Sequence, residues 1–233
     1  IIESTRHNFP AAIATFKRAL DIAPGSIKTL NNLGAVYVQL NDLNQAEKQF
    51  REAHKLAPSD RDANYNLGVL LMAKGRPAQA IPLFLHVHPA NLATQFTPVR
   101  AYLEAGQTVA ALQLAKTIST ENEKNLQVHF SLGLLLASQK QYAAAEYELE
   151  HADALQPNVF EIAYNLGQAY LRDGKYAQSG LALNRALRLE PGSVDAMYLM
   201  AQTYTNQAHP LDALDLLMRA HQITPNKAYD SFL

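Results

Sequence analysis

The tetrapeptide "YNLG" occupies residues 65–68 and returns at residues 164–167. Longer stretches around the motif also align. "NNLGAVYVQLNDLNQAEKQFREAHKLAP" at 31–58 matches "YNLGQAYLRDGKYAQSGLALNRALRLEP" at 164–191 without a gap. The offset between these two stretches is close to four periods of about 34 residues, and self-similarity at such a period predicts a stack of structural repeats.

Each repeat is predicted to fold as two helices. Apolar residues recur at intervals of three and four, and Gly, Asp or Asn interrupts them midway, as in "NDLNQ" and "RDGKY". A small residue opens each second helix, and a glycine recurs inside most first helices although it costs about 1 kcal/mol relative to alanine there. We therefore expect the glycine to pack closely against that small residue. The glycines are Gly34, Gly68, Gly133 and Gly167.

The pattern resembles that of the tetratricopeptide-repeat family, in which a large residue, Leu-Gly, Tyr, Ala, Phe, Ala and Pro recur with a period of about 34 residues. The resemblance covers essentially the whole chain. It implies an all-α fold, a right-handed α-solenoid superhelix of antiparallel helix pairs. We expect a single array of one partial repeat at 1–26, six repeats at 27–60, 61–91, 92–125, 126–159, 160–193 and 194–227, and the start of another repeat or a cap at 228–233. Because both ends fall within a repeat, we expect a fragment of a longer protein.

The period breaks within "FLHVHPANLATQFTPVR" at 84–100, where three residues are missing. Pro89 arrives early, and Pro98 replaces the leucine of "NLG". Proline suits the first position of a helix and threonine suits its N-cap, so we expect a helix to begin near Pro98 with Thr97 as its cap, shortened by about a turn. Ordinary drift of the repeat and a local bend that reshapes the binding surface both explain the break.

The composition argues against several classes of function. The chain has 20 Lys and Arg against 21 Asp and Glu, so it lacks the basic excess that drives binding to nucleic acid. No apolar run approaches the roughly 18 residues that span a bilayer. The absence of cysteine excludes disulfides, thiolate catalysis and cysteine zinc sites, and it suits cytoplasm and periplasm equally. We expect a soluble protein with no nucleic-acid partner and no membrane insertion.

No motif predicts catalysis, a cofactor or a metal. A phosphate loop, a nucleophile elbow and a metalloprotease motif are all missing. His86 and His88 diverge if they lie on a helix, and no acidic residue is near, so we interpret them as a surface helix end. Glu146, Glu148 and Glu150 are interpreted as a solvated helix face. We therefore expect a protein that is not an enzyme.

In the family, the first helix of each repeat lines the concave surface. Asparagine precedes Leu-Gly at Asn32, Asn66 and Asn165. In the repeats of O-linked N-acetylglucosamine transferases, asparagines at this position hold a peptide backbone, because an amide both donates and accepts hydrogen bonds. The alternative is that asparagine is simply the family's common choice there.

One residue earlier stands a series of aromatic residues. They could anchor apolar side chains of a ligand or wedge between neighbouring first helices, and the two readings are compatible. The series is Tyr65, Phe96, Phe130, Tyr164 and Tyr198. Further predicted peptide-binding residues are Arg100, Gln168 and Gln202. The same surface is expected to include residues of mixed charge, namely Lys28, Asp62, Val69, Leu134, Glu161, Arg172 and Asp195.

These features favour a non-catalytic scaffold that binds a peptide or protein segment in its concave groove. Two alternatives are the recognition arm of a larger enzyme, such as a glycosyltransferase, and self-association through exposed repeat ends. Binding of acidic chaperone tails is disfavoured. Such domains need converging lysines, an arginine and asparagines, whereas the matching positions here are acidic, neutral or apolar, and Lys28 and Arg100 lie two repeats apart.

Overall fold

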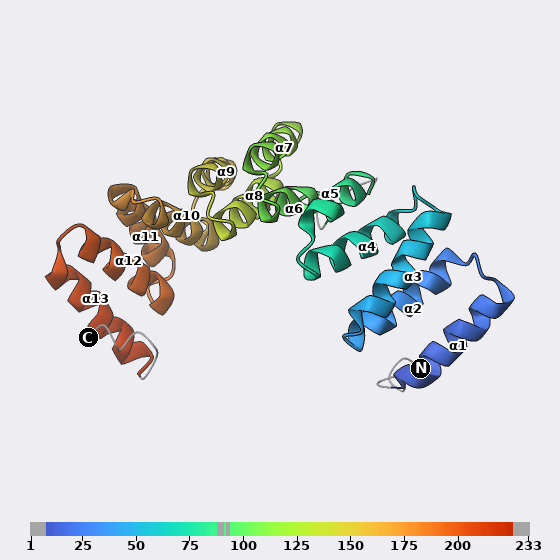
Figure 1. Ribbon diagram of the computed structural model, residues 1–233. Coiled ribbons are helices and arrows are strands. Elements are labelled where there is room, and N and C mark those ends of the chain that lie inside the picture. The colour runs from blue at the N-terminus through green and yellow to red at the C-terminus, as the bar shows by residue number, and fades with distance from the viewer. Residues whose placement is uncertain (1–7, 88–90, 92–93, 226–233) are drawn as a thin grey trace. The chain divides into compact units, whose positions relative to one another are not determined.

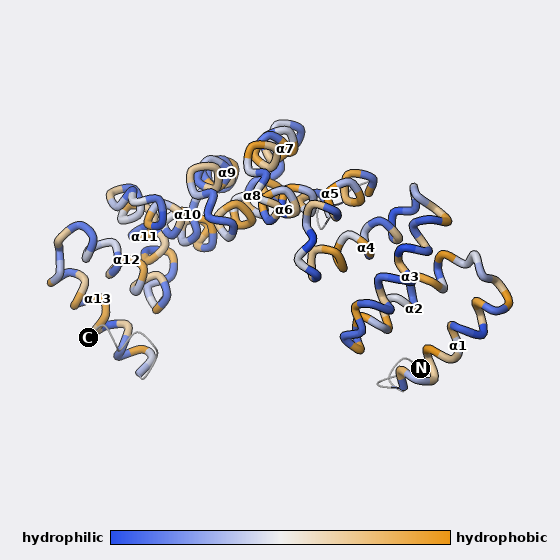
Figure 2. The backbone as a smooth tube through the Cα atoms, viewed as in Figure 1, coloured by the Kyte–Doolittle hydropathy of each residue, from blue (hydrophilic) through white to orange (hydrophobic). Residues whose placement is uncertain are grey.

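The computed structural model of the chain describes residues 8–87, 91 and 94–225. These residues form thirteen α-helices and no β-strand, which confirms the all-α repeat fold (Figure 1). The helices are α1 (Phe9–Ile22), α2 (Ile27–Gln39), α3 (Leu43–Leu56), α4 (Arg61–Ala73), α5 (Pro77–Leu85), α6 (Thr97–Glu104), α7 (Thr108–Glu121), α8 (Leu126–Ser138), α9 (Tyr142–Leu155), α10 (Phe160–Arg172), α11 (Tyr176–Leu189), α12 (Val194–Asn206) and α13 (Pro210–Ile223). Hydrophobic and hydrophilic residues alternate along them, as the orange and blue segments of α1 and α3 show in Figure 2.

Contacts divide the chain into two compact units, residues 1–111 and 112–233. In the first unit α2 packs against α3 and α4 against α5, and contacts of α3 with α4 join these pairs. In the second unit the pairs are α8 with α9, α10 with α11 and α12 with α13, and contacts of α9 with α10 and of α11 with α12 join them. Each helix packs chiefly against its neighbours in the chain, as in a repeat architecture.

The glycines of the first helices lie at close crossings within the pairs. A Cβ on Gly167 would lie 2.6 Å from Leu183 Cγ and 3.2 Å from the Leu183 backbone nitrogen, and Leu183 is fully buried. A Cβ on Gly68 would lie 2.5 Å from the ring of Phe84. The crossing is therefore close, as expected. The nearest groups, however, are the large side chains of Leu183 and Phe84. The small residues that we expected at these contacts lie four positions earlier on each second helix.

The break in the period shortens two helices. The second helix α5 has 9 residues where α3 has 14, and the first helix α6 has 8 where α4 has 13. Pro98 lies in the first turn of α6, as predicted, but the N-cap residue is Phe96, which makes no side-chain capping bond, and Thr97 is already inside the helix. Pro89 and His88 lie outside the described residues.

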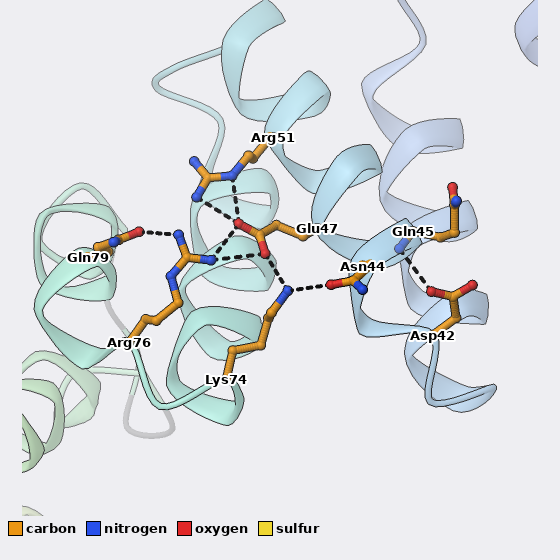
Figure 3. A network of polar contacts seen from close by, with 8 residues as sticks. All are labelled: Asp42, Asn44, Gln45, Glu47, Arg51, Lys74, Arg76 and Gln79. Atoms are coloured by element: carbon orange, nitrogen blue, oxygen red, sulfur yellow. Dashed lines mark hydrogen bonds and ion pairs between the residues drawn. The ribbon is translucent and has the colours of Figure 1, made fainter.

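Glu47 on α3 joins two successive helix pairs of the first unit (Figure 3). Its carboxylate accepts hydrogen bonds from Lys74 at 2.7 Å and from Arg76 at 2.9 and 3.1 Å, and these residues flank the turn between α4 and α5. Arg51, one turn along α3, donates a further bond of 2.8 Å. Burial raises the pKa of Glu47, but the hydrogen bonds from the three cations outweigh burial and hold the pKa at about 2.

The second unit repeats this arrangement with Glu146. Glu146 is the fifth residue of α9, as Glu47 is of α3. It accepts a hydrogen bond from Lys175, which occupies the N-cap position of α11 as Arg76 occupies that of α5. A carboxylate on one second helix and a cation before the next thus connect successive pairs in both units.

The prediction of a solvated acidic face on α9 is wrong for two of its three residues. Glu146 and Glu148 are only 4% and 3% exposed, and Glu150 alone lies at the surface. Burial is tolerated because Glu146 pairs with Lys175 and Glu148 with His129. Both partners come from other helices.

Gly167 should not tolerate a large side chain. We expect Gly167→Leu to lower the free energy of unfolding by about 1–3 kcal/mol, because overpacking displaces the buried Leu183. Gly192 is the matched control, since a Cβ there meets no atom within 4 Å. Urea unfolding measures both, and equal stability of the two leucine variants would contradict a tight crossing at Gly167.

Glu47 should make the stability of the protein depend on acidic pH. A folded-state pKa of about 2 against an ordinary 4.5 gives a contribution on the order of 3 kcal/mol that is present above pH 4.5 and is lost as the pH falls towards 2. Glu47→Gln should therefore be less stable than wild type at pH 7, and the difference should shrink towards pH 2. Urea unfolding at several pH values tests this, and a constant difference would refute it.

Candidate functional site

Two repeat positions on the first helices of the second unit form the centre of the candidate site. Each position recurs once per repeat along α8, α10 and α12. The two positions are four residues apart, so they share a face of each helix. We call these residues the first-helix site: Leu134, Gln168 and Gln202 at the first position, and Ser138, Arg172 and Asn206 at the second.

Two pockets adjoin at Arg172. One, of about 270 Å³, is lined by residues of α8 and α10, including Asn165, and by Tyr142 of α9. The other, of about 440 Å³, is lined by Arg172, by residues of α12, including Tyr198, and by Leu217 of α13. Four of the predicted peptide-binding residues lie around these pockets: Asn165, Gln168, Tyr198 and Gln202.

Arg172 is the charged group of both pockets. Its side chain is exposed at the C-terminal end of α10, and no acidic residue of the described part of the chain lines either pocket. Among the described residues, the Arg172 side chain has no hydrogen-bond or ion-pair partner. The other lining groups are amides, hydroxyls and aliphatic carbons, so the site carries a net positive charge.

The amide groups of the site are partly free. Asn165 donates from Nδ2 to the Glu161 carbonyl at 2.7 Å, and Asn206 donates from Nδ2 to the Gln202 carbonyl at 2.8 Å. Each bond leaves the side-chain oxygen as an acceptor. Within the described part of the chain, the side chains of Gln168 and Gln202 make no hydrogen bond. The site therefore offers donors and acceptors to a peptide backbone.

Part of this site was predictable from the sequence. The predicted groove residues included Leu134 and Arg172 but not Ser138 and Asn206. Both missing residues lie one repeat period from Arg172, so the repeat spacing is the signal that could have found them. The side chains of Ser138 and Asn206 are short and uncharged, so nothing in their chemistry singles them out as binding residues.

The aromatic series packs largely as wedges between helices. Phe130 on α8 packs against a buried cluster that includes Leu166 and Ala169 of α10, and Tyr164 on α10 packs against one that includes Met197 of α12. In the first unit the ring centroid of Tyr65 lies 6.2 Å from that of Phe84.

The aromatic residues are half-buried, and only Tyr198 of the series lines one of the two pockets. Phe96 departs from the series, because it precedes α6 instead of lying within a first helix. The shortened α6 lacks the turn that would have carried it.

The remaining predicted site residues belong to the first unit. Asn32 is exposed on α2 and Asn66 is half-buried on α4, and neither side chain has a hydrogen-bond partner among the described residues. Arg100 on α6 lies 3.6 Å from Glu104 one turn away, which partly compensates its charge.

A Ser, His and Glu set lies buried in the second unit but lacks the geometry of a nucleophilic site. Glu148 Oε2 lies 2.7 Å from His129 Nδ1 and accepts from Ser119 Oγ at 3.1 Å, while His129 Nε2 lies 3.0 Å from the Glu123 carbonyl. A nucleophilic serine must contact the histidine and reach substrate. Ser119 instead bonds to the carboxylate, and all three side chains are buried, so the set joins α7, α8 and α9 structurally.

The described residues contain no group of three or more His, Cys, Asp or Glu side chains arranged to hold a metal ion. His86 is exposed at the end of α5, where its Nδ1 lies 2.6 Å from the Pro82 carbonyl and donates to it. None of the described helices is long and apolar enough to cross a membrane.

Removing the buried carboxylate should be costly. We expect Glu148→Ala to lower the free energy of unfolding by about 3–5 kcal/mol, because His129 and Ser119 then lose their buried partner. Glu150→Ala, on the exposed side of the same helix, should cost less than about 1 kcal/mol. Thermal and urea unfolding compare the two variants, and similar stabilities would contradict this account of Glu148.

Comparisons with known proteins agree with this architecture. Two family models, both described as tetratricopeptide repeat, match the chain, one at residues 31–88, 99–160 and 164–228 and the other at residues 1–59. The anaphase-promoting complex subunit CDC16 of Saccharomyces cerevisiae (strain ATCC 204508 / S288c) is 25% identical over 157 residues. The match covers 63% of this chain and 19% of the yeast protein.

Solved structures show the same fold. The C-terminal part of a TPR repeat-containing protein from Cytophaga hutchinsonii has a TM-score of 0.71 at 17% identity, over 97% of this chain and 95% of that one. A tetratricopeptide repeat protein from Parabacteroides merdae ATCC 43184 has a TM-score of 0.60 at 16% identity, over 97% and 91% of the two chains. Repeat arrays of this kind present extended surfaces to protein partners. Since the family models match most of its length and its helices form the expected pairs, the chain belongs to the tetratricopeptide-repeat family.

Proposed function

We propose that the chain is a non-catalytic interaction scaffold, and that its first-helix site binds an extended segment of a partner protein. The observation that carries this proposal is the pair of pockets that adjoin at Arg172. They are lined by the same two repeat positions on three successive first helices. The free amide groups suit a peptide backbone, whose N–H and C=O groups need donors and acceptors at regular intervals. The likeness to a yeast protein named as a complex subunit also supports a scaffold.

The charge of the site selects among partner segments. Arg172 has no acidic neighbour in either pocket, so an acidic side chain of the partner is the group that best complements it. A guanidinium can bind a carboxylate through two parallel hydrogen bonds, which adds geometric selectivity. We expect the partner to place one Asp or Glu at Arg172 and neutral residues on either side.

The proposal predicts a loss of selectivity in Arg172→Gln. Wild-type protein, immobilised and exposed to a displayed library of random peptides, should enrich peptides with an acidic residue. Arg172→Gln should bind those peptides about 10- to 100-fold more weakly, because a hydrogen bond to a charged group is lost. Fluorescence anisotropy with the enriched peptides measures the change.

Arg188→Gln is the matched control, since Arg188 is an exposed arginine on the second helix α11. It should bind the peptides as the wild type does, and both variants should keep the wild-type melting temperature. Equal binding by wild type and Arg172→Gln would place recognition outside the first-helix site.

A further inference from the structure

Three pockets, one in the first unit and two in the second, occupy equivalent places in their repeats. Each lies between successive second helices and has the intervening first helix at its floor: α3, α4 and α5 in the first unit, and α9, α10 and α11 and then α11, α12 and α13 in the second. Leu67, Leu166 and Met200 hold the same floor position in the three. The pockets therefore follow from the fold, and only their chemistry can distinguish them.

The pocket of the first unit differs by a buried amide. Asn64 on α4 is fully buried and lines this pocket of about 360 Å³. Its Nδ2 donates to the Pro58 carbonyl at 2.8 Å, but its Oδ1 is buried without a hydrogen-bond partner among the described residues. A buried acceptor left unpaired is unfavourable, because it has given up its bonds to water.

The residues at the equivalent position of other described first helices have no unpaired buried polar atom. Leu30, Ala163 and Met197 are apolar and buried. His129, the equivalent residue of α8, has polar contacts at both of its ring nitrogens. An amide at this position is thus not required by the repeat fold, and its free oxygen has no structural use in the first unit.

A second free group lies in the same pocket. His54 on α3 lines it, and its Nδ1 is buried with no partner in the described part of the chain. Leu67, Leu71 and Leu83 supply aliphatic walls, and no acidic residue lines the pocket. The pocket therefore combines an acceptor, a ring nitrogen that can donate, and an apolar surface.

We propose that this pocket binds the side chain of a glutamine from a partner protein. Asn64 Oδ1 and His54 Nδ1 are both closed to solvent in this structure, so the groups that cover them must shift when the glutamine enters. The glutamine NH₂ group then donates to Asn64 Oδ1, its carbonyl accepts from His54 Nδ1–H, and its two methylene groups pack against the leucines. A primary amide carries donor and acceptor on separate atoms, so it can serve both groups at once.

Charged side chains fit this pocket less well. A carboxylate brings no donor to Asn64 Oδ1. An ammonium group brings no acceptor for His54. Arg51 also lines the pocket, but it is already paired with Glu47, so it selects for neither charge. The neutral amide is therefore the class of group that the pocket chemistry selects.

This surface is independent of the first-helix site. It is formed by α3, α4 and α5 in the first unit, whereas the first-helix site belongs to α8, α10 and α12 in the second. The pocket gives the protein a second place at which a partner could be held, and failure of either proposal leaves the other standing.

The test uses N-acetylglutamine methylamide as the probe and N-acetylglutamate methylamide as its charged isostere. We expect the glutamine probe to shift the amide NMR signals of Asn64 and its neighbours in the whole protein. It should bind Asn64→Leu and His54→Phe about two- to tenfold more weakly, as expected for the loss of one hydrogen bond. Both variants should fold. Leucine occupies the equivalent position of α2 at Leu30, and phenylalanine keeps a planar aromatic ring at position 54. Arg172→Gln should bind the probe as the wild type does.

Several results would overturn the proposal. One is the absence of any signal shift up to the solubility limit of the glutamine probe. Another is equally tight binding of the glutamate isostere. A third is unchanged binding in both Asn64→Leu and His54→Phe with their melting temperatures preserved, which would place the probe elsewhere on the protein.

Discussion

The close crossing of the two helices in a pair is the constraint on which the rest of the structure depends. At Gly167 the space where a Cβ would stand is taken by Leu183, and at Gly68 it is taken by Phe84. Absence of one carbon atom lets a large apolar side chain of the second helix reach the backbone of the first. In the four pairs that carry this glycine, the contact brings the two helices close together and limits which residues of the first helix can face outwards.

Contacts between successive pairs are chemically more varied. Glu47 and Glu146 reach cations that precede the next second helix. The same position of α11 is Gly180, and there the neighbouring Ser179 hydroxyl is hydrogen-bonded to the Thr203 hydroxyl of α12 at 2.9 Å. The junction between pairs therefore accepts either an ion pair or a neutral hydrogen bond. The two ionic junctions also differ from each other, because the cations around Glu47 lower its pKa whereas burial raises the pKa of Glu146.

The first helix therefore serves two surfaces. In the second unit, positions near the end of the helix line the pockets at Arg172, where we propose that a peptide with an acidic side chain binds. In the first unit, Asn64 near the start of α4 forms the floor of a pocket on the opposite, second-helix side. Asn66, two residues later, belongs to the predicted peptide-binding surface, so two neighbouring asparagines face different environments.

Sequence alone determined the features that depend on residues close in the chain. The period of about 34 residues, the paired helices, the tight glycine crossings and the shortened helix at Pro98 all follow from local spacing and backbone preference. Of the candidate site it located Asn165, Gln168, Tyr198 and Gln202, because repeat positions predict shared faces.

Tertiary structure decided the rest. Glu146 is buried because Lys175, 29 residues later, reaches it, and the wedging of Phe130 depends on a cluster that includes residues of α10. Whether Asn64 Oδ1 has a hydrogen-bond partner depends on the positions of all the donors around it, which only the folded structure gives. Such properties belong to groups that the fold brings together, and no local pattern in the sequence encodes them.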